Sequence, residues 1–134
     1  MLLKRKITVK AIVTEEYKSR LIAQLEQALR KVELSLQQLD FHGRRYLSET
    51  DNADPAQTAA VRERLGRQKK RQEQIRGSLS ERLSLVRQLE IGSEHTHAVL
   101  EGFADVSLGD NLAGKLEAAE IVLRDDIIVE MRNA

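Results

Sequence analysis

Two stretches of the chain carry their apolar residues at alternating intervals of three and four, the spacing of a coiled-coil seam. If the chain folds back near its single proline, Pro55, the two seams oppose each other with a constant sum of residue numbers, as an antiparallel pair requires. The pattern therefore predicts a helical hairpin over residues 14–93 with its turn at about 48–55. Its seam positions are Ile22, Leu25, Leu29, Val32, Leu36, Leu39, Gly43 and Tyr46, facing Leu89, Val86, Arg82, Leu79, Ile75, Gln72, Gln68 and Leu65.

Local signals at the ends of these stretches agree with two helices. Thr14 can cap the free amides of a helix that runs to about Leu47. Asp54 and Pro55 fit a helix start, with aspartate as the cap and proline at the first helical position. Gly92 supplies a stop for a return helix that ends at about Ile91.

The rest of the chain has the pattern of β-strands. Residues 3–13 alternate between apolar and mostly basic side chains, which predicts a half-buried strand. Strands are also expected at 98–108, where Gly102 marks a bulge, and at 120–124 and 127–132, with one or two helical turns before residue 119. The prediction is an α+β fold in which a long helical hairpin projects from a small antiparallel sheet or partial barrel, formed by residues 1–13 and 94–134.

The predicted hairpin is not uniform along its length. Near its root apolar residues face each other, whereas Leu39 faces Gln72 and Gly43 faces Gln68 towards the tip. Glycine within a helix costs about 1 kcal/mol relative to alanine. We therefore expect a firm inner half and a looser outer half.

Composition places the chain among small proteins without disulfides. It has 134 residues, no cysteine, 32% charged and 3% aromatic residues, and no long apolar run for a signal or a membrane span. We expect a cytoplasmic location. Its first 13 residues are basic and its last 40 or so are acidic, so the ends are expected to pair. A sheet this small has little apolar area to bury, and we expect a homo-oligomer formed through it.

Basic residues concentrate in the outer half of the predicted hairpin and form what we call the basic belt. Such a belt can bind phosphates of RNA by releasing counterions. The alternatives are that these charges form a solvated helix surface or a face that docks to another protein. The belt consists of His42, Arg44, Arg45, Arg62, Arg64, Arg67, Lys69, Lys70 and Arg71.

Other candidate chemistry is weaker. Glu49, Asp51 and Asp54 lie at the tip, where carboxylates can hold a magnesium ion as in transcript-cleavage factors that enter RNA polymerase, although such residues are also common in turns. His95 and His97 are a weak histidine pair whose one adjacent candidate for a third ligand is Glu94, and no metal is expected. No catalytic or cofactor motif occurs, and we expect neither enzyme activity nor a cofactor.

Three stretches of the chain resemble the YlqD family of uncharacterised bacterial proteins: Ile7 to Thr14, Glu101 to Asp110, and Glu120 to Arg132. The resemblance implies the order of strand, long helical hairpin and C-terminal strands. It implies no activity and no site residues.

The leading hypothesis is a non-enzymatic interaction protein whose hairpin contacts a larger partner, RNA or the ribosome, through the basic belt. The first alternative is a protein-binding or chaperone-like coiled-coil adaptor. The second is a factor that enters the polymerase channel with an acidic tip.

Overall fold

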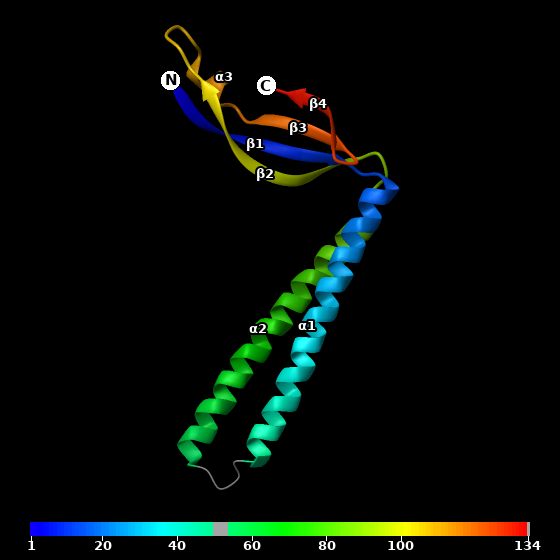
Figure 1. Ribbon diagram of the computed structural model, residues 1–134, viewed down its shortest axis with the longest axis vertical. Helices are drawn as coiled ribbons and strands as arrows, with labels where there is room; N and C mark the ends of the chain where they lie inside the picture. Colours follow the sequence, from blue (N-terminus) through cyan, green and yellow to red (C-terminus); the bar gives the residue numbers. More distant parts are fainter. Residues whose placement is uncertain (50–53, 134) are drawn as a thin grey trace. The chain divides into compact units, whose positions relative to one another are not determined.

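The fold is α+β, as predicted. The computed structural model describes residues 1–49 and 54–133. Along the chain its elements are β1 (Leu2–Ile12), α1 (Glu15–Glu49), α2 (Pro55–Arg87), β2 (Glu94–Asp105), α3 (Leu112–Leu116), β3 (Ala119–Arg124) and β4 (Ile127–Arg132) (Figure 1). They form two compact units, a sheet unit of residues 1–19 and 89–134 and a hairpin unit of residues 20–88.

The sheet unit holds four strands in the order β2-β1-β3-β4. β1 pairs antiparallel with β2, and β3 pairs antiparallel with β4, but β1 and β3 run parallel. The prediction of an antiparallel sheet was therefore wrong in this respect. After β2 the chain passes through α3 to the far flank of β1, so β3 arrives there in the direction of β1. Within the described residues the outer strands β2 and β4 do not pair, so the sheet is open and not a barrel.

One face of the sheet holds most of the unit's buried apolar residues. Val9, Ala11 and Val13 are buried there, as the alternation along β1 predicts. Arg5 shares this face. Its guanidinium donates from Nη1 to the carbonyl of Lys115 (3.3 Å) and from Nη2 to that of Asn133 (3.0 Å), so it ties β1 to α3 and to the end of β4.

The opposite face carries a row of charges over Val122, which is fully buried. Lys10 lies 3.1 Å from Glu120, and Arg132 lies 2.6 Å from Glu94 and 3.3 Å from Glu120. Glu94 is on β2, Lys10 on β1, Glu120 on β3 and Arg132 on β4, so the row crosses all four strands. The expected pairing of the basic and acidic chain ends is confirmed by these contacts.

Two details of the strands differ from the prediction. β2 begins at Glu94, four residues before the predicted start. Its register with β1 shifts between Val9 and Lys10, so His97 is an extra residue of β2 with no partner residue on β1, which is a β-bulge. Gly102 is therefore not the bulge. A Cβ at Gly102 would collide with the side chain of Ile7, so its lack of a side chain makes room for Ile7.

The turn between β3 and β4 is the predicted two-residue loop. Asp125 (φ 47°) and Asp126 (φ 67°) both adopt the left-handed conformation that a tight hairpin of this kind requires. Thr14 donates its hydroxyl to Oδ1 of Asp125 at 2.7 Å, which ties the turn to the start of α1.

The helix starts are as predicted. The hydroxyl oxygen of Thr14 accepts a hydrogen bond from the amide of Tyr17 (3.1 Å), and Asp54 Oδ1 accepts one from the amide of Ala56 (3.0 Å). Part of the predicted turn, residues 50–53, lies outside the described residues.

The return helix stops at Arg87, short of the predicted Ile91. The amide of Gly92 donates to the carbonyl of Val13 (2.7 Å), and the amide of Val13 donates to that of Ser93 (2.8 Å). These bonds place residues 92 and 93 beside the end of β1. The chain therefore leaves the helical path before Gly92, whose φ of 89° completes the turn.

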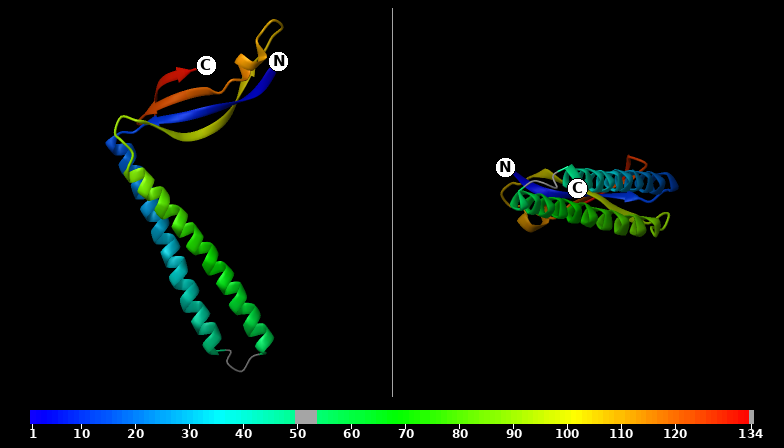
Figure 2. Two further views of the ribbon diagram at one scale, coloured as in Figure 1. Left: turned by 180° about the vertical axis from the view of Figure 1, so that it is seen from behind. Right: turned by 90° about the horizontal axis from the view of Figure 1, so that it is seen from below.

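In the hairpin unit α1 and α2 lie side by side, as both views of Figure 2 show. Most of the seam is confirmed in its inner half, where Leu25, Val32, Leu36 and Val86 are buried, but Ile75, predicted to face Leu36, is 40% exposed. The seam shifts by one residue in two places: Leu83 is buried instead of Arg82, and Leu47 is half-buried whereas Tyr46 is exposed. A straight helix has 3.6 residues per turn, so a strict seven-residue repeat drifts around it and the seam steps to the next position.

Candidate functional site

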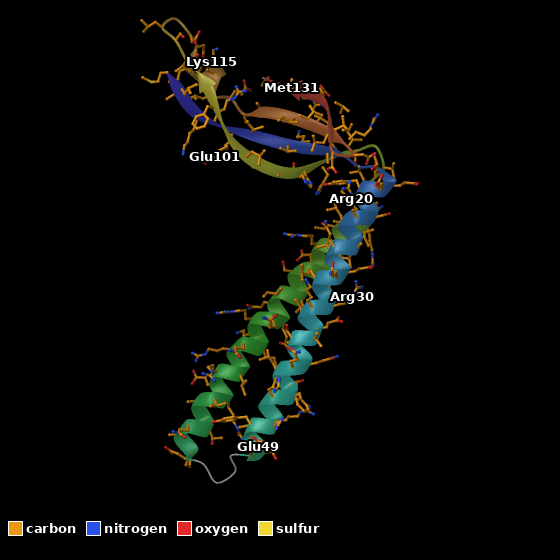
Figure 3. The ribbon with its side chains drawn as sticks, in the orientation of Figure 1. Arg20, Arg30, Glu49, Glu101, Lys115 and Met131 are labelled. Atoms are coloured by element: carbon orange, nitrogen blue, oxygen red, sulfur yellow. The ribbon has the colours of Figure 1, made fainter. Side chains whose placement is uncertain are left out.

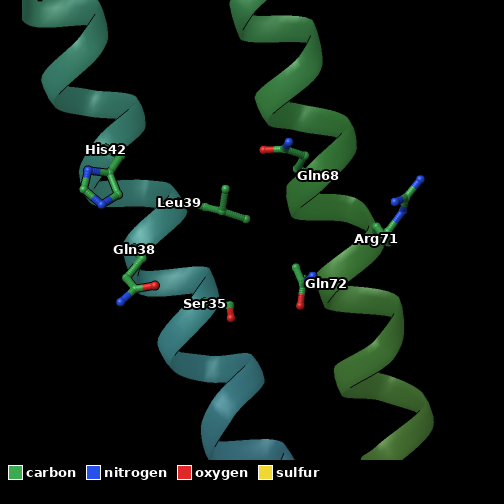
Figure 4. A pocket seen from close by; sticks show the side chains of 7 residues that line it. All are labelled: Ser35, Gln38, Leu39, His42, Gln68, Arg71 and Gln72. Carbon is green, nitrogen blue, oxygen red and sulfur yellow. The ribbon is translucent and has the colours of Figure 1, made fainter.

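The outer half of the hairpin is grooved on both sides of Leu39. The groove that we call the polar groove has a volume of about 390 Å³. Leu39 and Gln68 reach towards each other across it (Figure 4). Its lining residues are Ser35, Gln38, Leu39 and His42 from α1 and Gln68, Arg71 and Gln72 from α2.

The lining of the polar groove is rich in hydrogen-bonding groups and contains no carboxylate. Six of its seven side chains can donate or accept a hydrogen bond, and Arg71 carries a positive charge. Arg64 lies seven residues before Arg71 and therefore projects from the same side of α2. Within the described part of the chain, neither arginine has a carboxylate oxygen within 4.0 Å. Cations without an internal partner are available to an external anion.

The groove on the other side of Leu39, which we call the mixed groove, is smaller, at about 190 Å³. It includes Asp40, whose carboxylate lies 3.6 Å from Nζ of Lys69. One of its cations is thus already neutralised, although Arg44 also lines it. The mixed groove is completed by Leu39, Gly43, Leu47, Leu65 and Gly66.

Gly43 sets the spacing of the helices between these grooves. A Cβ at this position would lie 3.2 Å from Cδ1 of Leu65, so Leu65 covers Gly43, and not Gln68 as the strict register predicts. Gln68 is exposed and lines the polar groove instead. The difference accompanies the shift from Tyr46 to Leu47, where the seam of α1 steps by one residue towards the tip.

The predicted basic belt thus separates into parts with different surroundings. Arg45 pairs with Glu49 (3.0 Å) and Arg67 with Glu63 (3.9 Å), each within one helix, in exposed pairs of the kind that contribute little to stability. In the described ranges no carboxylate lies within 4.0 Å of Arg44, Arg62 or Lys70. His42 and Arg71 both line the polar groove, from opposite helices, and the side chain of Arg71 extends away from Leu39 (Figure 4). Arg44 and Lys69 line the mixed groove.

The acidic residues predicted at the tip have local roles where they are described. Glu49 accepts a hydrogen bond from Arg45, and Asp54 caps α2. Asp51 lies outside the described residues.

His95 and His97 lie beside Tyr17 in the sheet unit. The Tyr17 hydroxyl is 3.1 Å from Nδ1 of His97, and the Tyr17 and His95 rings have centroids 6.4 Å apart. No group of three potential metal ligands occurs among the described side chains. The same residues include no helix long and apolar enough to cross a membrane.

Sequence reasoning missed the neutral half of the polar groove, Ser35 and Gln38. The available signal was Gln68 and Gln72, two polar residues at seam positions where apolar ones are usual. A polar seam position indicates that the helices are not closed over an apolar contact at that level. Which neighbouring residues line the opening depends on the helix register, which the repeat gives only to within one step.

Comparison with known proteins places the chain in a family. The model of the YlqD protein family matches residues 1–132, essentially the whole chain. The chain belongs to the YlqD family. This confirms the resemblance carried by its terminal stretches.

One solved structure has the same fold along almost its whole length. The crystal structure of a protein of unknown function from Synechococcus sp. WH 8102 is 25% identical to this YlqD-family chain, with a TM-score of 0.84. The similarity covers 98% of this chain and 94% of the other. A search of the curated proteins gives no match.

Proposed function

We propose that this YlqD-family protein is a non-enzymatic interaction protein whose hairpin binds RNA, within the ribosome or its maturation machinery, through the polar groove and the arginines beside it. The observation that carries the proposal is the contrast between the two sides of Leu39. The polar groove has Arg71 and no carboxylate, whereas the mixed groove holds the Asp40–Lys69 pair.

The chemistry of the polar groove suits an RNA backbone. Arginine forms bidentate hydrogen bonds with phosphate oxygens, and Arg64 and Arg71 are spaced along one side of α2. Glutamine and serine side chains of the groove can accept and donate hydrogen bonds to sugar hydroxyls and base edges. No phenylalanine, tyrosine or tryptophan is among the residues that line the groove, and His42 supplies its one ring, so extended base stacking is not part of the proposed contact.

A matched pair of double variants tests the proposal. Arg64→Gln with Arg71→Gln removes two charges beside the polar groove, and Arg62→Gln with Lys69→Gln removes two charges from the same stretch of α2 but from its other side. Binding of a fluorescein-labelled single-stranded RNA and of a labelled RNA stem-loop is measured by fluorescence anisotropy across a salt series.

We expect the first variant to weaken binding of at least one RNA. It should also reduce the slope of log K against log salt by about one for each phosphate that the variant no longer binds. The second variant should stay close to the wild type. Equal weakening in both variants would show attraction to net charge without a defined site and contradict the proposal. Absence of wild-type binding to either RNA at low salt would also contradict it.

A protein-binding adaptor is the second candidate. Leu34 and Phe41 are seven residues apart on α1 and therefore share one side of it, and both are more than half exposed. Two such side chains cover much less than the area of a stable protein interface, so the observation favours RNA. If a polypeptide partner binds here, Phe41→Ser should weaken its binding and the double variant at Arg64 and Arg71 should not.

A further inference from the structure

β4 is the exposed outer strand of the sheet. Among the residues that the structure describes it pairs only with β3, on one of its sides, and every one of its residues except Arg132 is exposed. The exposed residues include Ile127 (67%), Val129 (50%) and Met131 (63%), and Figure 3 labels Met131 on this strand. An apolar edge with unpaired backbone amides and carbonyls is a template for another strand.

The opposite edge of the sheet is better protected against pairing. β2 carries Glu94, Glu101 and Asp105 along its length, and neither lysine nor arginine. A second β2 laid antiparallel to it would bring acidic side chains together. β4 has four apolar residues among six and lacks the lysines and prolines that usually protect an edge.

The charges of β4 favour an antiparallel over a parallel orientation for a second copy of the same strand. Asp125 and Asp126 lie immediately before the strand, Glu130 lies near its end, and Arg132, its last residue, already pairs with Glu94, Glu120 and Glu130 of its own chain. An antiparallel copy centred on Val129 places Asp126 opposite Arg132 and Glu130 opposite Ile128, so that no carboxylate lies directly opposite its equivalent in the other copy. A parallel copy would place like charges side by side, which is unfavourable.

The irregularity in β4 is also compatible with this arrangement. Its register with β3 shifts between Val122 and Leu123, which leaves Val129 as an extra residue near the middle of the strand. In a two-fold symmetric pair both strands carry the same extra residue near the axis. The two bulges then oppose each other, whereas a regular partner strand would be out of register on one side of Val129.

The amount of exposed apolar surface is consistent with an interface in this unit. Of 18 large apolar side chains that are exposed among the described residues, 13 belong to the sheet unit. A single four-stranded sheet buries little apolar area, so much of the apolar surface of this unit stays available to a partner. β4 contributes four of these 13 side chains, Ile127, Ile128, Val129 and Met131.

We propose that two copies of the chain form a symmetric dimer in which β4 pairs antiparallel with β4 of the partner, so that the two sheets become one. This inference does not depend on the function proposed for the hairpin, because all residues that carry it lie in the sheet unit.

The first test compares the same substitution on the two edges. Val129→Lys places two lysines near the proposed axis, whereas Val99→Lys changes an equally exposed valine on β2. Sedimentation equilibrium of the full chain should give a wild-type mass of twice the chain. Val129→Lys should raise the dissociation constant by about tenfold or more, since that corresponds to about 1.4 kcal/mol, and Val99→Lys should leave it unchanged.

The second test uses the absence of cysteine from the chain. In an antiparallel pair, residues opposite each other have Cα atoms about 4.5–5.5 Å apart, within the range of a disulfide. Val129→Cys should therefore form a disulfide-linked dimer under mild oxidation, and Val99→Cys should not. Both substitutions are at exposed positions, and circular dichroism checks that each variant folds.

Three results would overturn the proposal. The first is a wild-type chain that is monomeric at all concentrations. The second is equal weakening by the two lysine variants, or equal cross-linking of the two cysteine variants. The third is a concentration-dependent series of larger species, which would indicate open-ended pairing between different edges.

Discussion

At the scale of single residues, the three glycines of the hairpin have unequal surroundings. A Cβ at Gly43 would touch Leu65, whereas a Cβ at Gly66 or Gly77 would have no neighbour within 4 Å. Both of the latter lie in the interior of α2, where nothing in the structure requires glycine. Each of these two glycines therefore destabilises α2 as glycine does in any helix interior, and no close contact of the glycine compensates for this loss.

We predict that Gly66→Ala and Gly77→Ala each stabilise the protein by about 0.5–1 kcal/mol. Gly43→Ala should give a smaller gain, because the new methyl group must displace Leu65 by a few tenths of an ångström. Urea unfolding followed by circular dichroism measures the three changes. A gain at Gly43 as large as at Gly77 would show that Leu65 moves freely and that the close approach of the helices is not a packing constraint.

At the scale of elements, the row of charges across the sheet links strands that are distant in sequence. Hydrogen bonds from Arg132 hold the pKa of Glu94 and the pKa of Glu130 below their ordinary value. A hydrogen bond from Lys10, with a further one from Arg132, lowers the pKa of Glu120. Each carboxylate therefore binds its proton less readily in the folded state than in the unfolded state.

Lowered pKa values predict a loss of stability in acid. The contribution of these carboxylates is complete above the ordinary pKa of 4.5 and is lost as the pH falls through their lowered folded-state values. We expect the stability of β3 and β4 against urea to decrease at pH values below about 4.5. Amide NMR signals of the two strands measure this decrease. Arg132→Gln should reduce stability at neutral pH and make this acid loss smaller.

Arg124→Gln is the matched control, because Arg124 is also at the end of a strand and no carboxylate lies within 4.0 Å of it among the described residues. This variant should lose as much stability in acid as the wild type does. If Arg132→Gln and Arg124→Gln have the same pH profile, the charged row does not contribute to the stability of the sheet.

At the scale of the whole molecule, the described chain forms two compact units. The polar groove belongs to the hairpin unit and β4 to the sheet unit. Substitutions that are far apart and share no partner usually have additive effects.

We predict that Gly77→Ala and Val129→Lys act independently. In the double variant, the gain in stability from Gly77→Ala and the loss of dimer affinity from Val129→Lys should each equal the single-variant value within about 0.5 kcal/mol. Unfolding is measured at one fixed protein concentration, because dimerisation itself stabilises the folded state. A larger deviation would show that the two units are energetically coupled.

The sequence by itself determined the elements of this protein, because their signals are local. The seam from Ile22 to Leu39, the caps at Thr14 and Asp54 and the turn at Asp125–Asp126 depend on residues close in the chain, and the structure confirms each of them. Membership of the YlqD family could likewise be recognised from three short stretches.

Only the tertiary structure decided how these elements meet. Whether β3 lies parallel to β1 depends on the flank at which the chain arrives after α3, and no local pattern records that choice. The division of the basic belt between two grooves depends on a one-residue step of the seam near Gly43, which follows from the geometry of two packed helices. Such features arise from contacts between residues distant in sequence, so periodicity alone fixes which residues are candidates but not which of them come together.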